Sequence, residues 1–176
     1  VRYEVFTAGT IFARYTWYFY YLPMLFIPLC TFYATLYIDG EEKREFAKVK
    51  HLFGVITTLL FLGVLSNDFH QTVFGFQDGF LNWENDYTHG FGFFVVIAWT
   101  YFLYIFSIVI MFKKCRLSKV KKRWWITIIP FAIGITMQLL IAFGKMPKVN
   151  GLMVINFSEA VCFMIALFWE CCIRIG

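Results

Sequence analysis

The fold is decided by residues 52–65, LFGVITTLLFLGVL, together with the polar residues SNDFHQ that follow at positions 66–71. The first stretch is 14 residues long and carries no charge. At a helical rise of about 1.5 Å per residue it covers about 21 Å, whereas the hydrocarbon core of a bilayer is roughly 30 Å thick. We therefore expect a membrane helix to continue to about residue 74 and to carry polar side chains into the membrane. Ionisable groups at that depth are costly and indicate a functional site.

The composition of the whole chain supports a membrane protein. Of its 176 residues, 60% are hydrophobic, 22% are aromatic and only 15% are charged, which is more apolar surface than a soluble domain of this size can bury. The net charge of +5 does not indicate a nucleic-acid partner, because the basic residues lie in the connections between apolar segments. The five cysteines show no metal-binding spacing, so we expect neither a metal nor another cofactor.

Five apolar segments predict an all-α fold, a polytopic membrane helix bundle in which residues 1–176 form one domain. Pro23 and Pro28 interrupt the first segment and Pro130 interrupts the fourth, which predicts bends. The five predicted transmembrane helices cover about residues 15–38, 52–74, 91–112, 124–143 and 152–170.

The distribution of lysine and arginine predicts the orientation. Residues 39–50 carry four of them and residues 113–123 carry seven, whereas residues 67–90 carry none and residues 144–151 carry two. Because positively charged connections stay in the cytoplasm, the first two connections and the C-terminus are predicted to be cytoplasmic. The N-terminus and the other two connections then face outward from a cell membrane.

The outer loop, residues 67–90, is rich in aromatic side chains, which argues against disorder. Within it, QDG at positions 77–79 lies between VFGF at 73–76 and FLNW at 80–83. An Asp-Gly pair between apolar residues is a hairpin signal. We expect a short hairpin or compact cap on the extracellular face.

Polar residues from other predicted helices lie at a similar depth. Glu159 is about 10 Å along the helix axis from the outer end of the fifth helix, and Asn156 is on the same face of that helix. If the second helix continues, Asn67, His70 and Gln71 share a face as well. We predict a polar pocket that opens outward and binds the stimulus. Its candidate ligand-binding residues are Arg14 as a counter-ion, Asn67, Asp68, His70, Gln71, Gln138, Asn156 and Glu159, with Trp83 and Asp86 from the outer loop.

Other interpretations of these residues remain open. Buried polar groups also hold membrane helices together or cap helix ends without binding a ligand, which would make the chain a passive anchor. A small transporter or channel would use the same groups as a translocation path. Asp68, His70, Asp86 and His89 are suitable metal ligands, but their spacing matches no metal signature. No hydrolase, phosphate-loop or dinucleotide motif is present, so we expect no catalytic residue.

Four stretches of the chain resemble, in order, a known family. They are ARYTWYFYYLPMLFIPL at 13–29, LSNDFHQTVF at 65–74, NWENDYTHG at 82–90 and ECCI at 170–173. These stretches resemble the R-x-x-W-Y-x-Y-Y-x-P-x-L-F-x-P, L-T-N-D-L-H-Q-x-x-F, N-W-x-x-D-Y-x-Y-G and E-x-C-I patterns of the N-terminal seven-helix membrane region of bacterial sensor histidine kinases. Phe69 and His89 depart from these patterns, which more often have Leu and Tyr there.

The resemblance implies a function as well as a fold. The chain would hold the last five helices of the seven-helix region, with the first two preceding Val1. It would be a receptor of a two-component system that senses an extracytoplasmic or intramembrane stimulus. The output would be a cytoplasmic domain beyond Gly176, expected to be a histidine kinase, and kinase-like signalling implies a homodimer.

Overall fold

The computed structural model describes residues 10–37, 44–77, 80, 83, 87–115, 128–142, 145, 147–149, 152–153 and 157–175. These residues form mainly helices, with two short hairpins. The helices are α2 (Ile11–Phe19), α3 (Tyr21–Leu36), α4 (Arg44–Leu65), α5 (Asn67–His70), α6 (Phe91–Cys115), α7 (Ile128–Ala142) and α8 (Phe157–Ile175). The strands are β1 (Phe74–Phe76), β2 (Tyr87–His89), β3 (Lys148–Val149) and β4 (Leu152–Met153).

Helices α2 and α3 are two parts of one long apolar stretch. The side chain of Thr10 caps α2 by accepting the backbone N–H of Ala13 at 3.3 Å. The break between the helices falls at Tyr20, because the ring of Pro23 clashes with the carbonyl three to four residues earlier in a continuous helix. The predicted interruption at Pro23 is confirmed, whereas the one at Pro28 is wrong, since Pro28 lies inside the continuous helix α3. The first helix begins at Ile11 rather than near residue 15.

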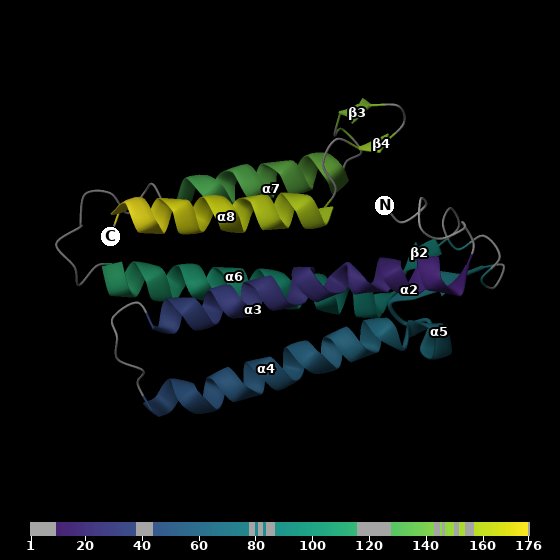
Figure 1. The fold of residues 1–176 in the computed structure, drawn as a ribbon, viewed down its shortest axis with the longest axis horizontal. Helices are drawn as coiled ribbons and strands as arrows, with labels where there is room; N and C mark the ends of the chain where they lie inside the picture. The colour runs from purple at the N-terminus through teal and green to yellow at the C-terminus, as the bar shows by residue number, and fades with distance from the viewer. Residues whose placement is uncertain are drawn as a thin grey trace.

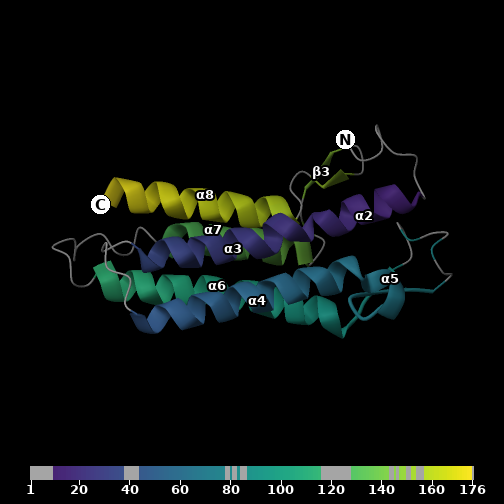
Figure 2. The same cartoon turned by 60° about the horizontal axis from the view of Figure 1, so that its bottom comes forward.

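Helix α3 is central to the bundle (Figure 1). It packs against α2, α4, α6 and α8, and α7 packs against α8. Leu29 and Phe32 of α3 are buried in one apolar cluster with Leu103 of α6. One end of the bundle carries α5 and the first hairpin, and we call it the capped end. The C-terminal ends of α3, α6 and α8 lie together at the opposite end, beside the start of α4 (Figures 1 and 2).

Three stretches of the described residues are long and apolar enough to cross a membrane: Ile11–Leu36, Lys48–Leu65 and Phe91–Ile110. They correspond to the first three predicted spans. Helices α7 and α8 occupy the positions of the fourth and fifth, but α7 has 15 residues and the described apolar part of α8 is Ala160–Glu170. The structure therefore supports an all-α membrane bundle, and the crossing of the membrane by α7 and α8 stays a prediction.

The second predicted helix ends before residue 74. Helix α4 stops at Leu65, and α5 adds only a single turn. Gln71 then adopts a left-handed backbone with φ of 49°, and its N–H donates to the carbonyl of Asn67 at 2.7 Å, an ending typical of helix C-termini. The predicted shared face is consequently wrong: Asn67 is buried, whereas His70 and Gln71 are exposed.

The hairpin in the outer loop exists, but its second strand is not the predicted segment 80–83. Strand β1 pairs antiparallel with β2, and Phe74, Gly75 and Phe76 face His89, Thr88 and Tyr87. The connection between the strands therefore covers residues 77–86. This longer connection lets Trp83 reach the interior, where its side chain is only 1% exposed.

Gly54 permits close contact between α3 and α4. The hydroxyl of Tyr33 donates to the carbonyl of Lys50 at 2.7 Å, and a Cβ at position 54 would lie 2.8 Å from that hydroxyl oxygen. We expect Gly54→Ala to be about 1–2 kcal/mol less stable than Gly63→Ala, since both gain the helix propensity of alanine but only the first overpacks against Tyr33. Equilibrium unfolding in mixed micelles measures this difference.

Gly63 provides the matched control on the same helix, because a Cβ there would meet no atom within 4 Å. Gly63→Ala should be neutral or stabilising by up to about 1 kcal/mol, as the helix propensity of alanine implies. Equal destabilisation by the two substitutions would contradict the packing role of Gly54.

Candidate functional site

A buried ion pair joins α2 to α5 at the capped end. Nη2 of Arg14 lies 2.7 Å from Oδ2 of Asp68, and Nε donates to both carboxylate oxygens at 3.1 Å. The two side chains are only 7% and 11% exposed. The hydroxyl of Tyr18 also donates to Oδ1 of Asp68 at 2.7 Å. The carboxylate therefore accepts hydrogen bonds from two residues of α2, one turn apart on the same face.

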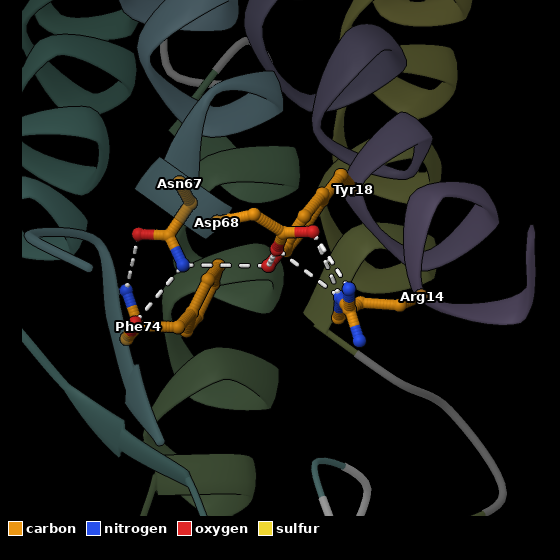
Figure 3. Close-up of polar contacts among 5 residues, drawn as sticks. All are labelled: Arg14, Tyr18, Asn67, Asp68 and Phe74. Carbon is orange, nitrogen blue, oxygen red and sulfur yellow. Dashed lines mark hydrogen bonds and ion pairs between the residues drawn. The ribbon is translucent and has the colours of Figure 1, made fainter. Parts of the chain in front are cut away.

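Asn67 continues this network into the hairpin (Figure 3). Its Nδ2 donates to the Phe74 carbonyl at 2.9 Å and to the Tyr18 hydroxyl at 3.3 Å. Its Oδ1 accepts the N–H groups of Val73 at 2.9 Å and of Phe74 at 3.0 Å. The side chain is fully buried. The side chain of Asn67 thus satisfies backbone groups at the start of strand β1 that would otherwise have no hydrogen-bond partner.

We call Arg14, Tyr18, Asn67 and Asp68 the polar latch. It links α2 to α5, which follows the end of α4, and to the first hairpin. The hydrogen bonds run from Arg14 to Phe74 (Figure 3). Because these groups are withdrawn from water, removal of one partner leaves another buried and unpaired. The arrangement connects α2, α5 and the first hairpin through one hydrogen-bond network.

Aromatic side chains surround the polar latch. The ring of Trp17 lies 4.4 Å from that of Phe74, 5.6 Å from Trp83 and 5.0 Å from Tyr87, measured between centroids. The guanidinium carbon of Arg14 lies 3.9 Å from the centroid of Phe80, which is a cation–π contact. Trp83, a predicted ligand-binding residue, is therefore part of this packed cluster.

The predicted site residues fall into three groups. The structure brings Arg14, Asn67 and Asp68 together, and their role in ligand binding stays a prediction. His70 and Gln71 lie on the exposed side of the same turn, where Oε1 of Gln71 accepts the N–H of Phe76 at 3.2 Å. The third group lies outside the part that the structure describes. Gln138 and Glu159 belong to α7 and α8, but their side chains are not described. Asp86 and Asn156 are not described at all.

Tyr18 is a functional candidate that the sequence did not single out. Its spacing of four residues from Arg14 places both on the same face of a helix, but that spacing alone does not distinguish Tyr18 from the other tyrosines of this stretch. The hydroxyl of Tyr18 connects the amide of Asn67 to the carboxylate of Asp68. A tyrosine in an aromatic-rich stretch gives no sign of such a role without the structure.

His89, on strand β2, is close to the latch but is not part of it. Its ring centroid lies 4.0 Å from that of Phe93 and 6.0 Å from that of Phe74. Partial burial against these rings lowers the pKa of His89 below the ordinary histidine value, because burial disfavours the charged form. Within the described residues, no three His, Cys, Asp or Glu side chains are grouped so that they could hold a metal ion.

The fold and the latch define a helical membrane region whose polar residues are gathered at one end. A family model described as the N-terminal 7TM region of histidine kinase matches residues 3–174. The chain belongs to this family and is a sensory membrane region of a histidine kinase, not a catalytic one. No curated protein and no solved structure matches the chain.

Proposed function

We propose that this region receives an extracytoplasmic or intramembrane stimulus at its capped end and relays it to a cytoplasmic output domain beyond Gly176. The observation that carries the proposal is the polar latch. It fixes the first hairpin and α5 to α2, and α2 leads directly into α3. Helix α3 packs against α8, the helix that leads toward the output. A displacement of the capped end can therefore reach α8 through helices that pack directly against one another.

The charge distribution supports the orientation that this proposal needs. The connections that follow α3 and α6 carry four and seven basic residues in the sequence, and the C-terminal ends of these two helices lie at the end opposite the cap (Figure 1). In the membrane of a bacterial cell the positive-inside rule places that end, and the C-terminus of α8, in the cytoplasm. The output is a histidine kinase, and the region acts as a homodimer.

A stimulus can act here only through a difference in its affinity for two arrangements of the helices. A difference of about 1–3 kcal/mol produces a useful switch. Opening or reinforcing the contact between Arg14 and Asp68 has an effect of this order, since both charges are largely withdrawn from solvent. The latch is thus suited to regulation.

A variant that keeps the fold but removes the latch charges tests the relay. We expect Arg14→Met/Asp68→Leu to insert and fold normally, because well-packed apolar residues replace buried ion pairs at little cost. Autophosphorylation of the full-length kinase in proteoliposomes should then differ from wild type by at least about fivefold, the effect of about 1 kcal/mol. Wild-type phosphorylation by the folded double variant would reject the relay and leave the latch a structural element.

The alternative function, a transporter or channel, needs polar groups along the inner half of the bundle, and Ser107 of α6 does not provide one there. The hydroxyl of Ser107 is buried and donates to the carbonyl of Leu103 in its own helix at 2.7 Å, so it does not offer a polar path. Ion flux through liposomes that contain the purified chain distinguishes this function from signalling.

A further inference from the structure

His70 makes contacts that specify its protonation state. On one side of the ring, Nε2 lies 3.0 Å from the carbonyl oxygen of Gly63 and 3.3 Å from the hydroxyl of Ser66. On the other side, Nδ1 accepts the backbone N–H of Thr72 at 3.1 Å and lies 2.7 Å from its hydroxyl. A carbonyl only accepts and an amide N–H only donates. The ring must therefore be neutral, with its proton on Nε2 and a lone pair on Nδ1.

We propose that His70 is a proton-binding switch, in which protonation of Nδ1 from the extracytoplasmic solution breaks the hydrogen bond from the backbone N–H of Thr72 and so signals acidification. This proposal rests on the proposed function, in which the capped end faces outward, and it names pH as the stimulus of that function. Histidine ordinarily changes charge between about pH 5 and pH 8, where such a signal is useful. The side chain is exposed, so protons from the surrounding water reach it without a pathway.

Protonation affects the two sides of the ring in opposite ways. The Nε2 bond to Gly63 survives, and it strengthens because a cation is favoured at the C-terminal end of α4. At Nδ1 the new N–H can donate to the Thr72 hydroxyl, 2.7 Å away, but it faces the backbone N–H of Thr72, which loses its acceptor. The ring keeps its contacts with Gly63 and the Thr72 hydroxyl, while the backbone N–H of Thr72 turns away from Nδ1.

Thr72 transmits this movement to α6. Its carbonyl accepts the N–H of Gly92 at 2.9 Å, in the first turn of α6. A Cβ at Gly90 would lie 2.2 Å from the same carbonyl oxygen, which shows how closely the backbones meet. Because α6 packs on the central helix α3, displacement of Thr72 alters the start of a helix in the core of the bundle.

Other charged groups do not account for this geometry. The polar contacts of the His70 ring come from Gly63, Ser66 and Thr72, none of which carries an ionisable side chain. Among the described residues of the elements around it, Asp68 faces away toward Arg14 and Tyr18. His89 of β2 packs on Phe93 and is the other histidine among the described residues of this end, so an experiment must control for it.

Amide hydrogen exchange of the chain in lipid nanodiscs tests the switch, with protons as the only added ligand. The protection factors of the Thr72 and Gly92 amides are measured by NMR at about pH 8 and about pH 5. We expect both to fall at least about fivefold at the lower pH, as loss of a hydrogen bond implies. His70→Gln, whose amide stays neutral, should show less than a twofold change (roughly the uncertainty of a bond's contribution).

The same measurements are repeated in a His89→Tyr background, which removes the other histidine. We expect the fall in the protection factors of Thr72 and Gly92 to persist there. The proposal is overturned if the nitrogen shifts of His70 show an Nδ1–H tautomer at high pH, or if Thr72 keeps its protection after the ring has become charged. An equal fall in His70→Gln overturns it as well. If Thr72 responds but phosphorylation by the full-length kinase does not, the switch stands and the relay fails.

Discussion

Asp68→Leu is expected to lower the free energy of unfolding by about 3–5 kcal/mol, the cost of breaking a buried ion pair by removing one partner. The substitution leaves the guanidinium of Arg14 with 7% of its side chain exposed and without its carboxylate. It also removes the acceptor of the Tyr18 hydroxyl. Reversible unfolding of the purified chain in mixed micelles measures the loss.

The double variant Arg14→Met/Asp68→Leu is the matched control for this prediction. It carries the same leucine but leaves no unpaired charge, so its stability should lie within about 1–2 kcal/mol of wild type. A large coupling between the two positions in the double-mutant cycle is therefore expected. If Asp68→Leu were as stable as the double variant, the ion pair would not contribute to the fold.

Asn67→Leu is expected to cost about 3 kcal/mol or more, because its loss leaves several buried backbone groups unsatisfied at about 1–3 kcal/mol each. Those groups are the N–H groups of Val73 and Phe74 and the carbonyl of Phe74. Leucine has nearly the same shape as asparagine, so the effect of a cavity is small. Amide exchange at Val73 and Phe74 should accelerate together with the loss of stability.

Gln71→Leu is the control for this second prediction. Gln71 is exposed and accepts a single bond, from the N–H of Phe76, so its replacement should cost less than about 1.5 kcal/mol. Comparable losses at positions 67 and 71 would mean that the polarity of the loop, rather than the geometry of Asn67, holds the hairpin.

Hydrophobic length and basic connections were sufficient to predict the class of the fold. The third predicted helix begins at residue 91, where α6 begins, because the apolar run there is long and follows a glycine. The resemblance in 13–29 and 65–74 led to the family that the comparison confirms. The depth of the polar residues in the predicted helices, independently of the resemblance, had grouped Arg14, Asn67 and Asp68 in one candidate site.

The details of the capped end could not be predicted, because they depend on contacts between distant residues. Periodicity alone lets a helix run through Asn67 to Phe74. The helix ends instead because the side chain of Asn67 satisfies the backbone of the following strand. The partner strand at Tyr87–His89 is likewise selected by the burial of Trp83 and Phe74 rather than by the Asp-Gly signal.

Accessibility of single cysteines in intact bacterial cells tests most directly whether the capped end faces outward. In a background without the five native cysteines, Gln77→Cys places a thiol beside the first hairpin and Lys48→Cys places one near the start of α4, both at exposed positions. A membrane-impermeant maleimide should label Cys at position 77 in intact cells and Cys at position 48 only after lysis. Labelling of position 48, and not of position 77, in intact cells would contradict the orientation on which the sensory relay and the proton switch depend.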